Sequence, residues 1–385
     1  MPLRALLRHL LLAALLTALL PAAPALAAAD ADPRILALEK LGRAQPFEAA
    51  KALDALLPEV PEHSAQRLEL LTVQGLMLAA AAPPEAVEPT VARLDAWGRD
   101  PTAANAAAAA AAALLVRARS VARDGNLHSA DLLMREAMAR LPADTAGRAR
   151  YRFVFVHGYI LGRAGQLEPA VRLSHEALGL ADAHGELWQQ SEARTELANS
   201  YHAARQLERA RSLSAEAIAL AAKADDAVAL GRAHNTAAIV LDALGDPPGE
   251  RRSLEAAIAS ARRAGAQLDE VRYLANLADF FLKNGEYKTA LATAERALPL
   301  ARALKDRNSE MVALANIGLA HISLLHLEPG KRYVREAIAI DEGRGAVSGV
   351  ADTLRELGTY LEKAGDAAGA VAAYHQHRLL ATTLL

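Results

Sequence analysis

The sequence predicts an all-α fold, a right-handed α-solenoid of stacked antiparallel helix pairs. The first observation is a position that recurs every 40 residues, which we call the register. It is occupied by Gly125, Gly165, Arg205, Gly245, Gly285, Leu325 and Gly365. The second is that small residues recur at three fixed offsets from this register, for example at Ala278, Ala290 and Ala297 around Gly285. The third is composition, because 52% hydrophobic but only 4% aromatic residues suit closely packed helices rather than sheets. One helix pair cannot bury both of its faces, so the units must stack.

The amino-terminal segment has the pattern of an export signal. Arg4 and Arg8 precede the apolar run Leu10–Leu20, and Ala25-Leu26-Ala27 supplies the small residues that a signal peptidase reads. The run is too short to span a bilayer comfortably. We therefore expect residues 1–27 to be a cleaved signal peptide, with an uncleaved anchor as the alternative. The mature protein is then periplasmic or secreted, without stable membrane insertion after signal cleavage.

Residues 28–111 are expected to form degenerate N-terminal helical repeats. The segments Leu38–Pro58 and Arg67–Trp97 lie near the register but lack its glycines, as terminal units of a solenoid often do. Pro83-Pro84 and Pro101 indicate turns between helices. The eight alanines of Ala106–Ala113 are interpreted as a strong helix former rather than a membrane helix.

Residues 112–385 are expected to hold about seven 40-residue units, each with two helices. In one unit the first helix covers Val271–Lys283, where apolar residues recur at the spacing of an amphipathic face. Asn284-Gly285 is a helix-terminating signal, since glycine adopts the left-handed conformation at little cost. The second helix begins at Tyr287. The final segment Ala367–Leu385 is apolar at its end, which favours self-association through this C-terminal helix.

This pattern resembles the tetratricopeptide repeat (TPR) family. The small–glycine–small–small offsets match the family signature, as does a large apolar slot occupied by Leu161, Tyr201, Leu241, Phe281 and Leu361. The period of 40 indicates a longer-helix subtype. The resemblance implies a superhelix whose first helices line a concave groove. An export signal followed by such repeats also resembles the extracytoplasmic sensory region of bacterial signalling proteins such as diguanylate cyclases and histidine kinases.

The residues expected to face this groove lie on the non-packing side of the first helices. They stand 13, 10, 6, 3 or 2 positions before the glycine register in the central units. The candidates are Arg152, Phe155, Tyr159, Arg163, Glu192, Thr195, Asn199, His202, Arg232, Asn235, Asp242, Arg272, Asp279 and Lys283. Arginines and asparagines could bind an extended peptide or its carboxylate. The alternative is that these polar residues are only the solvated face of amphipathic helices. Asn276 and Asn316, at another offset, are expected in packing or hydrogen bonds between units.

No signature of catalysis or metal binding is present. There is no phosphate loop and no HExxH, and His375 and His377 point to different sides of a helix. The absence of cysteine excludes disulfides and thiolate metal sites, and the net charge of −2 gives no reason to expect nucleic acid. We expect no cofactor. The sequence thus predicts an exported, non-enzymatic scaffold that holds a peptide or partner protein. The alternative is the sensory half of a truncated or split membrane signalling protein, and a hydrolase is third.

Overall fold

The computed structural model describes residues 32–382, and the predicted signal peptide lies outside this range. Within it the chain consists of α-helices joined by short turns, with one 3₁₀ helix at Leu57–Glu59 and no strand. The α-helices are α2 (Pro33–Gly42), α3 (Pro46–Leu56), α4 (Ala65–Ala81), α5 (Pro84–Gly98), α6 (Ala106–Arg123), α7 (Leu127–Arg140), α8 (Gly147–Arg163), α9 (Leu167–His184), α10 (Leu187–Ala203), α11 (Leu207–Lys223), α12 (Ala227–Leu244), α13 (Pro247–Ala264), α14 (Gln267–Lys283), α15 (Tyr287–Ala303), α16 (Arg307–Ser323), α17 (Leu327–Gly343), α18 (Val347–Lys363) and α19 (Ala367–Ala381). No helix in 32–382 is both long and apolar enough to cross a bilayer.

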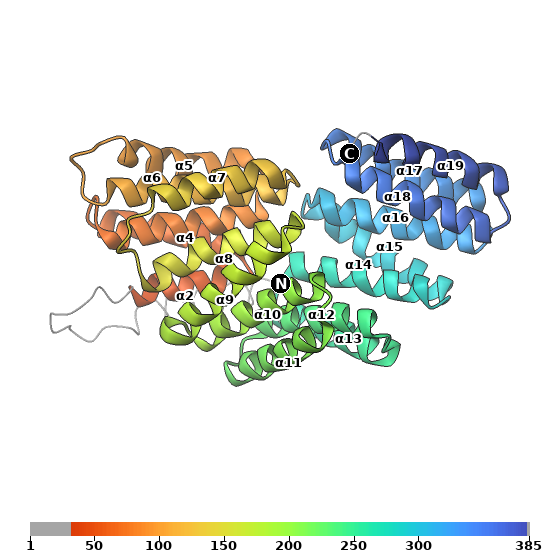
Figure 1. Ribbon diagram of the computed structural model, residues 1–385, viewed down its shortest axis with the longest axis horizontal. Helices are drawn as coiled ribbons and strands as arrows, with labels where there is room; N and C mark the ends of the chain where they lie inside the picture. The colour runs from red at the N-terminus through yellow and green to blue at the C-terminus, as the bar shows by residue number, and fades with distance from the viewer. Residues whose placement is uncertain (1–31, 383–385) are drawn as a thin grey trace, which may run out of the picture.

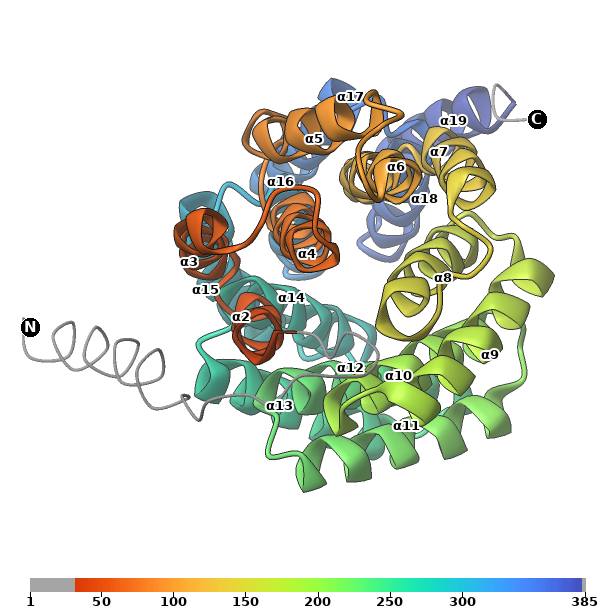
Figure 2. The same cartoon turned by 90° about the vertical axis from the view of Figure 1, so that its left-hand side faces the viewer.

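Consecutive helices pack against each other along the whole described chain, and successive first helices such as α10 and α12 also touch. The pairs stack into a solenoid that curves strongly (Figure 1). In Figure 2 the first helices α4, α6 and α8 lie on the inside of the curve, with α5, α7 and α9 outside. The prediction of an all-α solenoid is confirmed. We call the surface formed by the first helices the inner face.

What recurs every 40 residues is a left-handed backbone conformation, whether or not the residue is glycine. Gly285 has φ 78°, in the left-handed region, and Gly125, Gly165, Gly245 and Gly365 also have positive φ. The two positions where the sequence lacks glycine keep the same conformation, with φ 59° at Arg205 and 63° at Leu325. A left-handed residue costs an L side chain about 1–2 kcal/mol. Packing of the flanking helices therefore imposes the turn even where the local sequence disfavours it.

Replacing Gly285 by valine is expected to lower the free energy of unfolding by about 1–2 kcal/mol, because a β-branched residue is poorly suited to positive φ. A Cβ at Gly285 would meet no atom within 4 Å, so the loss reports backbone strain alone. Urea denaturation of both proteins measures it. The reciprocal variant Leu325→Gly should instead gain stability, since Leu325 is 68% exposed and loses little packing. An unchanged midpoint in Gly285→Val would contradict the assignment of strain to this turn.

The small residues of the register bring the two helices of a unit together. Ala278, Ala290 and Ala297 are each 0% exposed. In α16–α17 both contact positions are glycine, and a Cβ on Gly318 would lie 2.8 Å from the carbonyl oxygen of Gly330. The backbones of α16 and α17 therefore touch directly at this point.

Hydrogen bonds donated by asparagine side chains join neighbouring first helices. Asn276 Nδ2 donates to Asn235 Oδ1 at 2.8 Å, and Asn316 Nδ2 donates to the carbonyl of Ala275 at 2.9 Å. The prediction that Asn276 and Asn316 serve contacts between units is confirmed. These bonds hold α12, α14 and α16 in register along the inner face.

Candidate binding surface on the inner face

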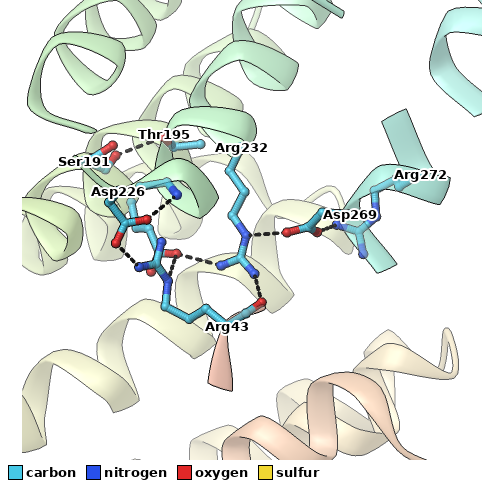
Figure 3. Close-up of polar contacts among 9 residues, drawn as sticks. Arg43, Ser191, Thr195, Asp226, Arg232, Asp269 and Arg272 are labelled. Carbon is cyan, nitrogen blue, oxygen red and sulfur yellow. Dashed lines mark hydrogen bonds and ion pairs between the residues drawn. The ribbon is translucent and has the colours of Figure 1, made fainter. Parts of the chain in front are cut away.

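The curvature of the solenoid brings its first helix pair onto the middle of the chain. Arg43, the residue that follows α2, lies between α10 and α12 (Figure 3). Its Nε is 2.9 Å from Glu192 and its Nη1 is 2.9 Å from Asp226, a residue 183 positions away. The guanidinium also lies 4.3 Å from the ring centre of Trp188. One arginine thus joins three residues of two distant helix pairs.

Arg232 extends this set into what we call the Arg43 network, which comprises Arg43, Glu192, Asp226, Arg232 and Asp269. Arg232 Nη1 lies 2.6 Å from Glu192, and its Nε lies 3.2 Å from Asp269. Its Nη2 donates to the backbone carbonyl of Arg43 at 3.5 Å. The network therefore links α2 to α10, α12 and the start of α14 through charged groups.

The two aspartates of the network are ionised despite their burial. Burial raises the pKa of Asp226, but the charge of Arg43 and the hydrogen bond from the Ala229 N–H outweigh it and hold the pKa below its ordinary value. Burial likewise raises the pKa of Asp269, but the charges of Arg232 and Arg272 outweigh this effect and hold the pKa below its ordinary value. The network is therefore an array of paired charges at neutral pH.

Three of the residues predicted to face a ligand instead take part in contacts with the amino-terminal helices. Glu192 and Arg232 belong to the Arg43 network. Arg152 is 6% exposed and bridges Glu39 of α2, at 2.8 Å, and Glu69 of α4, at 2.9 Å. Their charges are satisfied within the chain. The sequence does not predict these ion pairs, because the partner residues lie in repeats far away along the chain.

Other predicted residues are also paired, although they lie on first helices. Thr195 donates to the carbonyl of Ser191 in its own helix, and Arg272 lies 3.0 Å from Asp269. Lys283 sits between Asp242, at 3.2 Å, and Asp279, at 2.8 Å. Asn235 accepts the hydrogen bond from Asn276 already described, and His202 is half-buried. A ligand role for these residues stays a prediction.

A second set of inner-face residues differs, because none of its charged groups forms an ion pair in the described chain. We call it the Arg119 cluster: Arg119 of α6, Tyr159 and Arg163 of α8, and Glu196 of α10. The Arg119 guanidinium carbon lies 4.7 Å from the Tyr159 ring centre, and Arg163 donates to the Tyr159 hydroxyl at 3.2 Å. Within residues 32–382 neither arginine forms an ion pair, and Glu196 forms none either. Asn199 supplies a hydrogen bond to Glu196.

The electrostatics of this cluster reflect the missing partners. Burial lowers the pKa of Arg119, and the nearby charges of Arg163, Arg272 and Arg232 lower it as well. Burial raises the pKa of Glu196 to about 7, although the hydrogen bond from Asn199 and the charges of Arg119 and Arg163 act in the opposite direction. Cations here repel one another, and the one carboxyl among them is partly protonated at neutral pH.

Sequence reasoning found Tyr159, Arg163 and Asn199 but missed Arg119 and Glu196. Arg119 stands six positions before Gly125, which is the offset that selected Tyr159 and Asn199, so extending the count to the first clear unit would have found it. Glu196 stands nine positions before Arg205, the offset of Asn276 and Asn316. The asparagines at that offset are predicted to serve packing between units, and nothing in the sequence distinguishes Glu196 from them. In the part of the chain that the structure describes, no group of histidine and acidic side chains is arranged to hold a metal ion.

No protein-family model and no curated protein matches this chain. Solved structures do resemble it. A Rap protein complexed with Competence and Sporulation Factor has a TM-score of 0.68 at 17% identity, over 91% of this chain and 98% of that one. The Rap conjugation gene regulator of plasmid pLS20, in complex with the Phr* peptide, has a TM-score of 0.59 at 14% identity, over 92% and 97%.

A third similar structure carries the name of the repeat. It is a signal transduction ATPase with a tetratricopeptide repeat sensor from Pyrococcus horikoshii, with a TM-score of 0.51 at 13% identity, and it matches 89% of this chain over 54% of its own. The chain has the fold of a TPR superhelix. Rap proteins therefore share with this TPR superhelix an arrangement of helices that extends over nearly its whole described length.

The inner face of this TPR superhelix thus carries two kinds of charged group. Those of the Arg43 network neutralise one another and join distant helices. Those of the Arg119 cluster lie beside an aromatic ring and retain free hydrogen-bonding capacity, because two guanidinium groups can offer several N–H donors to an incoming acceptor. The arrangement can therefore bind an external group, and nothing in it supplies a nucleophile paired with a base.

Proposed function

We propose that this protein is an exported, non-enzymatic TPR binding or scaffold protein that holds a peptide or partner protein on its inner face. The observation that carries the proposal is the Arg119 cluster. Folded chains rarely leave half-buried charges without partners, because each unpaired group costs free energy. Here the half-buried Arg119 and Glu196 form no ion pair within residues 32–382, and neither does the exposed Arg163, all on first helices around the half-buried ring of Tyr159.

The similar solved structures support a peptide as the occupant. One of them is a complex with the Phr* peptide, and its helices superpose on nearly the whole of this chain. A peptide also fits the chemistry of the surface, since aromatic rings can pack against its side chains while arginine and asparagine groups bind its polar atoms.

A second copy of the chain is a further partner that we propose. Val371 and Leu379 of α19 are 68% and 54% exposed, which favours self-association through that helix.

We expect the intact protein to retain members of a random hexapeptide library in equilibrium dialysis, with the retained peptides identified by mass spectrometry. Tyr159→Ser should lower the retained amount about tenfold, since it removes an aromatic anchor worth on the order of 1–2 kcal/mol. Leu132→Ser is the matched control, because Leu132 lies 54% exposed on the second helix α7, outside the inner face. Equal retention by the Tyr159 and Leu132 variants would contradict binding on the inner face.

Export is tested by the intact mass and cell fraction of the natively expressed protein. A soluble extracytoplasmic species that begins near Ala28 supports a free binding protein. A larger, membrane-bound product would instead support the alternative, in which these repeats are the sensory part of a signalling protein. Neither outcome alters the peptide assay, which uses the purified chain.

A further inference from the structure

The unpaired charges of the Arg119 cluster point to a ligand with an anionic group. The described chain forms ion pairs at most of its half-buried arginines, among them Arg43, Arg152, Arg194 and Arg232. The half-buried Arg119 is an exception, and the exposed Arg163 beside it also forms no ion pair within residues 32–382. Both lie against the ring or hydroxyl of Tyr159, which orients their guanidinium groups without neutralising them. A ligand carboxylate placed here would gain two charge-assisted contacts in a partly desolvated setting.

Glu196 is an anion that competes with a ligand, because its charge interacts with those of Arg119 and Arg163. A Cβ built on Gly162 of α8 would lie 3.9 Å from Glu196 Oε1, so the carboxyl group rests against the helix that carries Tyr159 and Arg163. When ionised, Glu196 repels an incoming carboxylate. When protonated, it leaves the arginines unopposed and adds one O–H donor. Binding of an anion and protonation of Glu196 should therefore favour each other.

We propose that Arg119 and Arg163 form a binding site for the carboxylate of a peptide ligand, and that Glu196 gates this site by taking up a proton when the ligand binds. The inference rests on the proposed peptide-binding function and specifies its ligand chemistry and its dependence on pH. The carboxylate belongs either to the peptide carboxyl terminus or to an aspartate or glutamate side chain.

The other ionisable groups around Glu196 do not account for a transition near neutral pH. Burial raises the pKa of Tyr151 above its ordinary value of 10. Burial also raises the pKa of Tyr159, but the charges of Arg119 and Arg163 outweigh it and lower that pKa from the same ordinary value, which is three units above neutral pH. Glu192 lies one turn before Glu196 and is held in ion pairs with Arg43 and Arg232. His202 of the same helix has its pKa lowered, by burial first and by the charge of Arg205 next. The charged or titratable groups that interact with Glu196 are Arg119, Tyr151 and Arg163. Tyr159, Arg232 and Arg272 surround Arg119.

The gate can first be tested without a ligand. Because the pKa of Glu196 in the folded protein, about 7, lies above its ordinary value of 4.5, folding favours the protonated form. Its contribution to stability is therefore full below pH 4.5 and is lost as the pH rises through 7. Glu250, whose pKa burial also raises to about 7, acts in the same window. Glu196→Gln should remove part of the fall in stability between pH 5 and 8, and Glu250→Gln a separate part.

The binding test uses three N-acetylated hexapeptide libraries without histidine. The first has a free carboxyl terminus and no acidic residue, the second is its carboxyl-terminal amide, and the third is an amide that contains aspartate and glutamate. We expect the first or third library to be retained at least tenfold more than the second. Retention of the first alone identifies the terminal carboxylate, and retention of the third identifies an acidic side chain.

Retention should be about tenfold higher at pH 6 than at pH 8, because the fraction of protein with protonated Glu196 changes by that factor around a pKa of about 7. Arg119→Gln should lower retention at least tenfold at both pH values. Glu196→Gln should keep retention and abolish its pH dependence. Arg117→Gln, two residues away but paired with Asp95, is the control and should change neither.

The outcomes separate this site from the broader function. If the amide library without acidic residues binds as well as the others, peptide binding stands and the carboxylate site is wrong. If carboxylates are retained equally at pH 6 and 8, the gate is wrong. If no library is retained at either pH, the proposed function and the site fail together.

Discussion

Arg43→Ala is expected to lower the free energy of unfolding by about 3–5 kcal/mol, because it removes one partner of a buried ion pair. The Arg43 side chain is 8% exposed, and that of its partner Asp226 is 2% exposed. Without Arg43, the nearest remaining cation is Lys40 at 3.7 Å. Urea denaturation measures the loss, and amide hydrogen exchange should show it first in α2 and at the start of α12, where the network joins the first helix pair to the middle of the chain.

A matched control is Arg93→Ala, since Arg93 forms an ion pair with Asp54 at 2.9 Å but both side chains are about half exposed. Surface pairs contribute about 0–1 kcal/mol, so this variant should be near neutral. The double variant Arg43→Met with Asp226→Asn should recover part of the loss, because it leaves no unpaired charge at Asp226 and keeps an oxygen to cap α12. Equal stability of the Arg43 and Arg93 variants would show that the network does not hold α2 in place.

Gly318→Ala is expected to cost about 2–3 kcal/mol, because the added methyl group overlaps backbone atoms that cannot rotate away. Its Cβ would lie 2.6 Å from Val334 Cγ2, 2.8 Å from the Gly330 oxygen and 3.0 Å from the Val334 nitrogen. Two of these three atoms belong to the backbone of α17. The helices α16 and α17 must therefore separate, which also disturbs their contacts with the next unit. Thermal and urea midpoints measure the loss.

The control for Gly318 is Gly179→Ala in α9, where a Cβ would meet nothing within 4 Å. Alanine is the better helix former by about 0.8–1 kcal/mol, so this variant should gain stability. The same substitution thus has opposite expected signs at two helical glycines. A loss at Gly179 similar to that at Gly318 would mean that close helix approach is not the cause.

The structure changes which substitutions can test binding. From the sequence alone, Arg232→Glu with Asn235→Ala is expected to spare folding and abolish partner capture. In the structure Arg232 pairs with Glu192 and Asp269, and Asn235 accepts a hydrogen bond from Asn276. A glutamate at position 232 would face two carboxylates, so the variant should lose stability, and lost capture would not identify a binding surface. Arg119 has no such partner and gives the cleaner test.

The repeat is predictable from the amino-acid sequence, because it depends on local chemistry. Small residues such as Ala278 and Ala290 are needed wherever two helices touch, and the spacing of helices and turns follows from short-range preferences that recur every 40 residues. Even so, the left-handed turns at Arg205 and Leu325 lack glycine, and the packing of the flanking helices imposes them.

Only the tertiary structure decided which inner-face charges are paired. The curvature of the solenoid accumulates small rotations over many units and places Arg43 beside Asp226, a contact that no periodicity predicts. That contact and its neighbours neutralise Arg152, Glu192 and Arg232, whereas Arg119 and Arg163 form no ion pair in the described chain. Equivalent positions in the register thus acquired different roles, because long-range electrostatic contacts depend on where the whole superhelix brings each side chain.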